Sequence, residues 1–184
     1  MLLVEGPRVA RDALDAGSAV HEALYTREAA RDPDVATLLE ELRARGVDVE
    51  EVDEAQLARF ADTVTPQGLL LAVGIPSRAL SDVAVPRLVV LDAVQDPGNV
   101  GTLIRAADAL GAGGVALLPG TVDPWNPKVV RAAAGASFRL PVVETTLEEL
   151  AAWCRDAGAP LLVAAAGGEP APRSAGPTGA ALVL

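Results

Sequence analysis

The sequence has one cysteine, one histidine and few aromatic residues. A single cysteine, Cys154, excludes an internal disulfide and a zinc site, and we expect no metal. The single histidine, His21, leaves no basis for a Ser/His/Asp triad, so we interpret it as a surface residue. Cys154 shares a helical stripe with Leu147, Leu150 and Ala151, which favours a buried structural thiol.

Long apolar runs are absent as well. No run reaches the roughly 18 residues of a membrane span, and the N-terminal MLLVEGPR meets Glu5 and Arg8 too early for a signal peptide. We therefore expect a cytoplasmic protein with no membrane partner. Hydrophobic residues make up 51% of the chain and aromatic residues 3%, which predicts a core of leucine, valine and alanine.

Basic residues are outnumbered, with 15 Lys and Arg against 25 Asp and Glu and a net charge of −10. Such a balance argues against an indiscriminate nucleic-acid binder, which normally carries a basic footprint. The charge is uneven: residues 1–83 have 8 Arg against 16 acidic residues, and residues 84–184 have 7 basic against 9 acidic residues. An RNA partner would therefore be held locally, by few arginines.

A segment rich in proline and serine, PSRALSDVAVP at 76–86, marks a domain boundary. We place a first domain at 1–76, a linker at 77–86 and a second domain at 87–184. Strand and helix patterns alternate on both sides of the linker, which predicts an α/β fold with parallel βαβ units in the second domain.

In the first domain, apolar spacing and turn residues indicate three helices and three strands. We expect Asp53 to cap a short helix with Leu57 and Phe60 inside, followed by the polar turn 63–68. The other elements are a helix at 6–16, a strand at 20–25, a helix from Asp32 or Asp34 to Arg45, and strands at 47–52 and from 69 onward.

In the second domain, the predicted strands are 88–92, 114–118, 140–143, 161–166 and 180–184. The predicted helices are 99–110, 127–134 and 147–157. The sequence stops inside an apolar strand pattern at 180–184, so we expect the second domain to be truncated or incompletely represented.

Residues 87–110 join a buried strand to an amphipathic helix through the turn D-P-G-N. Asn99 is predicted to be the N-cap of this helix. The stripe opposite the apolar face carries Gly101, Arg105 and Asp108, at a junction of the kind where open α/β sheets bind ligands. Two interpretations remain open: Asn99 and Arg105 serve a site, or Asn99 only caps the helix and Arg105 pairs with Asp108.

Further along, Lys128 and Arg131 lie on one side of the 127–134 helix and either contact phosphate or only face solvent. Trp125, between two prolines, either stacks on a base or packs into its own loop, and packing is favoured. The loop 164–168 follows a strand and either touches an adenosyl group, through Ala165 and Gly167, or is a plain turn.

Three stretches carry a family resemblance: V-Q-D-P-G-N-V-G-T-L-I-R-A-A-D-A-L-G at 94–111, D-P-W-N-P-K-V-V-R-A-A-A-G-A-S-F-R-L-P-V at 123–142, and V-E-G-P-R-V-A-R-D-A-L at 4–14 together with T-V-T-P-Q-G at 63–68. Together these stretches extend along nearly the whole chain, in the order in which one known family carries them. The chain resembles the SpoU (TrmH) family of RNA ribose 2′-O-methyltransferases.

The resemblance implies a ribosomal-protein-like RNA-binding domain followed by a parallel-sheet methyltransferase domain of the trefoil-knot type. It also implies a homodimer, S-adenosylmethionine as methyl donor, and structured RNA as substrate, with rRNA favoured over tRNA. The family's G-x-E loop and Ser-Leu-Asn segment are absent from the sequence, which ends at Leu184. We therefore expect the second domain to be truncated and to hold the donor poorly.

For chemistry, the resemblance implies that Arg105 and Asn99 act on the ribose hydroxyl. Because a guanidinium is a poor base, we expect Arg105 to stabilise a developing alkoxide or clamp a phosphate; whether it also accepts the proton stays open. Arg8, Thr65 and Gln67 are the implied RNA contacts of the first domain, although a capped helix and a tight turn explain them equally well.

Two competing functions remain. One is a catalytically inactive RNA-binding protein that lost the cofactor-binding tail. The other is a small-molecule nucleotide enzyme using the 92–105 junction, which is weaker because the junction lacks G-x-G-x-x-G and G-x-x-x-x-G-K-[ST].

Overall fold

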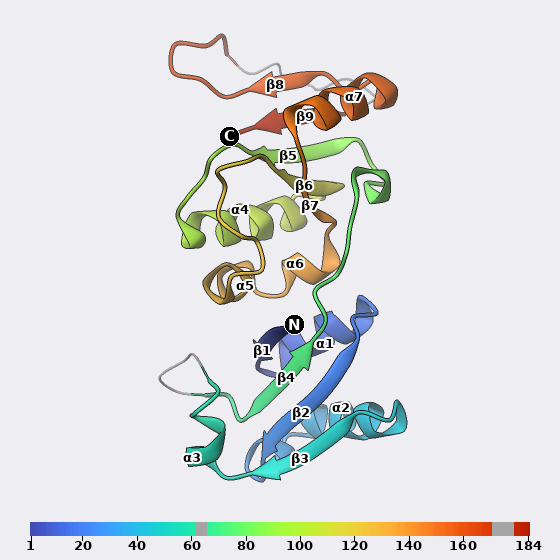
Figure 1. Cartoon of the computed structure of the whole chain (residues 1–184), viewed down its shortest axis with the longest axis vertical. Coiled ribbons are helices and arrows are strands. Elements are labelled where there is room, and N and C mark those ends of the chain that lie inside the picture. Colours follow the sequence, from blue (N-terminus) through green and yellow to red (C-terminus); the bar gives the residue numbers. More distant parts are fainter. Residues whose placement is uncertain (62–65, 171–178) are drawn as a thin grey trace. The chain divides into compact units, whose positions relative to one another are not determined.

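The computed structural model describes residues 1–61, 66–170 and 179–184. The chain forms two compact units, Met1–Pro76 and Ser77–Leu184, each with its own sheet (Figure 1). Within the described ranges, no helix has the length and apolar composition needed to span a membrane.

The first unit is built on a mixed four-stranded sheet with the strand order β1-β4-β2-β3. Strand β4 pairs antiparallel with β1 and β2, and β2 pairs parallel with β3. All five residues of β4 are buried, so this strand forms the centre of the unit. The elements are β1 (Leu2–Glu5), α1 (Pro7–Asp15), β2 (Val20–Thr26), η1 (Ala29–Arg31), α2 (Pro33–Ala44), β3 (Asp48–Val52), α3 (Glu54–Leu57) and β4 (Leu69–Val73).

Local sequence signals explain where the helices of this unit begin. The side chain of Asp32 accepts a hydrogen bond from the backbone N–H of Asp34 at the start of α2, and Asp53 forms a capping box with Gln56 at α3. The expected burial of Phe60 is wrong, because α3 ends at Leu57 and the Phe60 side chain is 56% exposed.

The second unit contains a five-stranded, all-parallel sheet with the strand order β7-β6-β5-β9-β8. The strands lie close to the predicted positions, although β8 ends three residues earlier than expected. The elements are η2 (Leu80–Asp82), β5 (Arg87–Leu91), α4 (Pro97–Ala109), β6 (Gly114–Leu117), α5 (Pro127–Ala133), α6 (Ala136–Arg139), β7 (Val142–Glu144), α7 (Leu147–Ala157), β8 (Leu161–Val163) and β9 (Ala180–Val183).

Helices cover both faces of this sheet. Figure 1 shows α4, α5 and α6 on one side and α7 on the other. Ile104 of α4 and Val129 of α5 are buried with Leu91 and Val115 in one core cluster, while Leu150 and Cys154 of α7 belong to the other. Apolar spacing predicts a buried stripe on α4 made of Val100, Leu103, Ile104, Ala107 and Leu110. The stripe faces the core except for Leu110, which follows the helix and is 83% exposed.

Part of the segment expected to be a linker is packed structure. The second unit begins at Ser77, and the short helix η2 lies within 77–86. Val83 is buried in the same cluster as Leu88 of β5, and Leu80 packs against that cluster. Through these two apolar side chains, the proline-containing segment packs into the hydrophobic core of the second unit.

Candidate functional site

The turn after β5 is fixed to the loop after β6, at the carboxyl edge of the parallel sheet. The backbone N–H groups of Leu118 and Val122 donate to the carbonyls of Leu91 and Val94, at 2.9 and 3.0 Å. Ala93, between Leu91 and Val94, has a φ of +54°. This left-handed conformation costs about 1 kcal/mol for a residue with a Cβ. These contacts hold the segment leading into α4 in one conformation.

Helix α4 starts two residues earlier than predicted. Asp96 is its N-cap, and the Asp96 Oδ1 atom accepts a 2.8 Å hydrogen bond from the backbone N–H of Asn99. Pro97 occupies the first helical position, where no backbone N–H is needed. The assignment of Asn99 as N-cap is therefore wrong, and its exposed side chain lies on the first turn of the helix.

Gly101 lies at a close approach of α4 and α5. It is buried, and a Cβ at this position would lie 2.5 Å from both the Ala132 Cβ and the Val129 carbonyl oxygen. Gly101 therefore serves helix packing and does not line an open junction. The crossing sets the position of Arg105, one turn further along α4.

Arg105 is exposed, and among the residues that the structure describes its guanidinium has no hydrogen-bond or ion-pair partner. The expected alternative, a pair between Arg105 and Asp108, is wrong. Both Nε and Nη2 of Arg139, on α6, donate to Asp108 Oδ2 at 3.0 and 2.8 Å. Sequence reasoning missed Arg139 because it lies 31 residues from Asp108.

The helices α4 to α6 carry a local excess of positive charge. Residues 97–139 contain four basic residues, Arg105, Lys128, Arg131 and Arg139, against two acidic ones. Lys128 and Arg131 are exposed on α5, whereas its other face is buried. In a chain of net charge −10, this basic layer, formed by Arg105, Lys128, Arg131 and Arg139, is a local exception that favours contact with a phosphate backbone.

Trp125 packs into its own loop, in agreement with the favoured interpretation. Its ring lies 5.7 Å from the ring of buried Phe138, and its backbone N–H donates to Asp123 Oδ1 at 2.8 Å. Trp125 thus fixes the loop before α5 against α6.

The turn after β8 contains the two residues expected to touch an adenosyl group, Ala165 and Gly167. The N–H of Ala164 donates to the Val183 carbonyl, and the N–H of Gly168 donates to the Ala165 carbonyl. The turn therefore lies beside the end of β9, at the carboxyl edge of the sheet. Both residues are exposed, so they do not by themselves enclose an adenosine.

In the first unit, Gln67 lies against the turn that precedes α1. Its backbone N–H donates to Glu5 Oε1, and a Cβ on Gly6 would come within 2.3 Å of the Gln67 side-chain oxygen. Gly6 has a φ of +89°. Arg8 is exposed in the first turn of α1, so these predicted RNA contacts come from neighbouring segments, whereas Thr65 lies outside the described residues.

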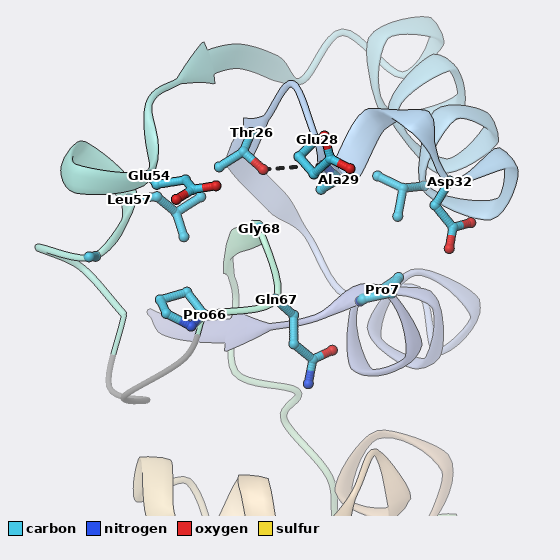
Figure 2. A pocket seen from close by; sticks show the side chains of 12 residues that line it. Pro7, Thr26, Glu28, Ala29, Asp32, Glu54, Leu57, Pro66, Gln67 and Gly68 are labelled. Carbon is cyan, nitrogen blue, oxygen red and sulfur yellow. Dashed lines mark hydrogen bonds between the residues drawn. The ribbon is translucent and has the colours of Figure 1, made fainter.

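A cavity of about 690 Å³ opens beside Gln67 (Figure 2). Leu57, Val35 and Ala29 supply apolar walls, and carboxylates come from Glu28, Asp32 and Glu54. Sequence reasoning missed this cavity because its walls come from separate segments. Three carboxylates disfavour a phosphate in this cavity.

The single thiol behaves as the sequence indicated. Cys154 is buried in α7 and unpaired, and burial raises the pKa of its thiol. A buried thiol with a raised pKa is a poor nucleophile. Within the described residues, no group of three or more His, Cys, Asp or Glu side chains is arranged to hold a metal ion.

Family models match both units. The model described as RNA 2′-O ribose methyltransferase substrate binding matches residues 3–78, and the SpoU rRNA Methylase family matches residues 86–184. The second match covers more than half of the chain.

Curated relatives have related names. The human "rRNA methyltransferase 3, mitochondrial" is 34% identical over 153 residues, which is 77% of this chain and 34% of that protein. The "23S rRNA (guanosine(2553)-2'-O)-methyltransferase RlmP" of Bacillus subtilis is 34% identical over 145 residues, covering 79% of this chain and 54% of that protein. The chain thus spans between a third and about half of the length of these relatives.

Solved structures share the fold. An AdoMet-bound rRNA methyltransferase from Sinorhizobium meliloti superposes with a TM-score of 0.86 and 30% identity, covering 99% of this chain and 69% of that one. A putative RNA methyltransferase of the TrmH family from Porphyromonas gingivalis gives a TM-score of 0.75 at 31% identity, covering 100% and 71%. Because the SpoU rRNA Methylase model matches more than half of the chain, the chain belongs to the SpoU rRNA methylase family.

Proposed function

We propose that this chain transfers a methyl group from S-adenosylmethionine to a ribose 2′-hydroxyl of rRNA. The observation that carries the proposal is the unpaired, exposed guanidinium of Arg105 on α4, within the basic layer of the second unit. Family membership and the names of the relatives favour rRNA over tRNA as the substrate.

The reaction needs a hydroxyl oxygen placed in line with the methyl group and freed of its proton as the new bond forms. The guanidinium of Arg105 is a cation with several N–H donors, so it would lend positive charge to the developing alkoxide or hold the adjacent phosphate through two N–H donors. Asn99 lies exposed on the first turn of the same helix, and its amide would orient the ribose. We assign these roles to Arg105 and Asn99.

S-adenosylmethionine, when bound, supplies the methyl group from its sulfonium centre. Ala165 and Gly167 would contact one edge of the donor, because their turn lies beside the end of β9. The AdoMet-bound structure of the Sinorhizobium meliloti relative supports this choice of donor. The exposed turn supplies contacts only, and no proton or charge is moved by it.

RNA binding would use few charges. Lys128 and Arg131 on α5 would hold phosphates in the second unit, and Arg8 and Gln67 would contact RNA in the first. The match of residues 3–78 to a substrate-binding model supports a role of the first unit in holding RNA. With so few cations, we expect affinity to fall less steeply with salt than for a basic nucleic-acid binder.

We also propose a homodimer, and a cytoplasmic location that cell fractionation tests. The apolar side chains of Val163, Leu182 and Leu184 are 64%, 39% and 39% exposed at the β8 end of the sheet, which supports self-association there. Sedimentation velocity at micromolar concentration tests it: a dimeric species is expected, and a monomer at all concentrations would contradict it.

The reaction itself is tested by incubating the chain with rRNA and S-adenosylmethionine labelled in its methyl group. We expect label in the RNA and a phosphodiester that resists alkaline cleavage at the modified nucleotide, since a methylated 2′-oxygen cannot attack the phosphate. Label on a base, or RNA binding with no transfer, would contradict the proposal.

A further inference from the structure

We infer that Arg139 is a positioning residue that keeps Arg105 unpaired by occupying Asp108. This inference rests on the proposed role of Arg105 in methyl transfer. It concerns three side chains from two helices of the second unit, α4 and α6, which Figure 1 shows on the same side of the sheet.

Asp108 is the natural competitor for Arg105. The two residues lie three positions apart on α4, so their side chains share one helix face and are within ion-pairing reach. The Asp108 side chain is only 26% exposed, which limits its hydration and makes a cationic partner valuable. A pair between them would hold the guanidinium of Arg105 along the helix and away from a bound ribose.

Arg139 removes this competition through geometry. Two of its nitrogens, Nε and Nη2, converge on the same Asp108 oxygen at 3.0 and 2.8 Å. Both are charge-assisted hydrogen bonds, and two of them to one oxygen hold a carboxylate more firmly than one does. Arg139 therefore holds Asp108 better than a neighbour on the same helix would.

The core determines where Arg139 stands. It is the last residue of α6, and the two residues packed before it, Ser137 and Phe138, are each 2% exposed. Gly135 starts the turn with a φ of +87°, and the N–H of Phe138 donates to the Gly135 carbonyl. With Phe138 anchored against Trp125, the backbone of Arg139 has little freedom to leave Asp108.

Removing Arg139 should have two effects. Asp108 becomes free to pair with Arg105. An ion pair of this kind on a helix surface lowers the population of unpaired Arg105 by about twofold. The uncompensated carboxylate also repels nearby RNA phosphate. For charges ~7 Å apart in water, this repulsion lowers the affinity for RNA by about threefold. We expect kcat/KM of Arg139→Ala to fall about fivefold at low salt, with part of the loss remaining in kcat at saturating RNA.

The test compares Arg139→Ala, Asp108→Asn and the double variant Arg139→Ala/Asp108→Asn. The double variant should recover to within about twofold of the wild type, because no carboxylate is left to capture Arg105 or repel RNA. Asp108→Asn alone should be as active as the wild type. A double variant as impaired as Arg139→Ala would overturn the inference, since Arg139 would then act on RNA or on the fold directly.

A second readout does not depend on methyl transfer. Phenylglyoxal modifies free guanidinium groups, and peptide mass spectrometry reports the labelling rate at Arg105. We expect that rate to fall about twofold in Arg139→Ala and to return in the double variant. An unchanged rate would overturn the inference. Labelling that follows the expected order while Arg105→Ala retains full transfer would support the positioning and refute the proposed function of Arg105.

Arg139→Gln provides a second variant of similar side-chain length, should Arg139→Ala unfold. It lacks the charge, so it should show the same loss and the same rescue by Asp108→Asn. Arg139→Lys keeps a cation beside Asp108 and should retain most of the activity. Equal impairment of the lysine and glutamine variants, with no rescue, would contradict the inference.

Discussion

Gly101→Ala should destabilise the second unit by forcing α4 and α5 apart. The added Cβ would lie 2.5 Å from the Ala132 Cβ and from the Val129 carbonyl oxygen, whereas ordinary contacts lie at 3.4–4 Å. Neither neighbour can rotate away, because one is a backbone atom and the other is attached directly to the backbone. The helices must therefore separate by about 1 Å, a typical overpacking strain.

The expected loss combines two opposing contributions. Overpacking a tight contact costs about 1–3 kcal/mol, and replacing glycine by alanine inside a helix returns up to about 1 kcal/mol. Because neither neighbour can move, the upper part of the overpacking range, about 2–3 kcal/mol, applies, and the net loss should be about 1–2 kcal/mol. With a urea dependence of about 2 kcal/mol per molar, the middle of the usual range, the unfolding midpoint should fall by roughly 0.5–1 M.

Tryptophan fluorescence in urea measures this loss selectively. The chain has two tryptophans, Trp125 and Trp153, and both belong to the second unit. Gly98→Ala is the matched control on the same helix: a Cβ there meets only Asp96 Oδ1, at 3.1 Å, and this side-chain oxygen needs to move by only a few tenths of an ångström, so that it still accepts from the Asn99 N–H. That variant should keep or slightly raise the midpoint. Gly101→Ala unfolding at the same urea concentration as Gly98→Ala would refute the close crossing of α4 and α5.

Two further predictions concern helix capping and acid stability. Asp96→Ala removes the acceptor for the Asn99 N–H and should cost about 1 kcal/mol; an unchanged urea midpoint would contradict the cap assignment. The hydrogen bond from Arg11 holds the pKa of Glu41 below its usual range. The ionised carboxylate therefore stabilises the first unit when the pH is above the unfolded-state pKa of about 4.3, and this contribution is lost as the pH falls below that value. Glu41→Gln should therefore lose less stability than the wild type on acidification from pH 6 to pH 3, measured by circular dichroism; parallel losses would count against the pair.

Much of the fold could be predicted because burial leaves a periodic trace in the sequence. The runs at 88–92 and 114–118 are short and apolar, and both form buried strands. The pairing of β5 with β9 could not be predicted, because Leu88 and its partner Ala181 lie far apart in the sequence and no local pattern links them. The order of strands across the sheet therefore came only from the structure.

Errors at the helix ends have a local cause. The apolar stripe of α4 starts at Val100, which drew the predicted start to Asn99. The cap lies at Asp96, before a proline that suits the first helical position. Leu110 fitted the spacing but follows the last helical residue, so its side chain faces solvent.

Only part of the candidate site could be predicted from the sequence. Arg105 and Asn99 could be identified from one short motif, and the sequence left open whether Arg105 pairs with Asp108. Only the folded chain resolves this question, because the partner of Asp108 comes from α6. Ion pairs between distant segments leave no periodic signal, which is why Arg139 could not be predicted.

The most direct test of the proposed function is methyl transfer to rRNA by Arg105→Ala, measured beside calorimetric binding of S-adenosylmethionine. Loss of a group that stabilises transition-state charge costs about 10²–10³ in kcat, so we expect transfer to fall by that factor while the affinity for the donor changes by less than about threefold. Full turnover by Arg105→Ala would contradict the role assigned to Arg105 and, with it, the site proposed on α4.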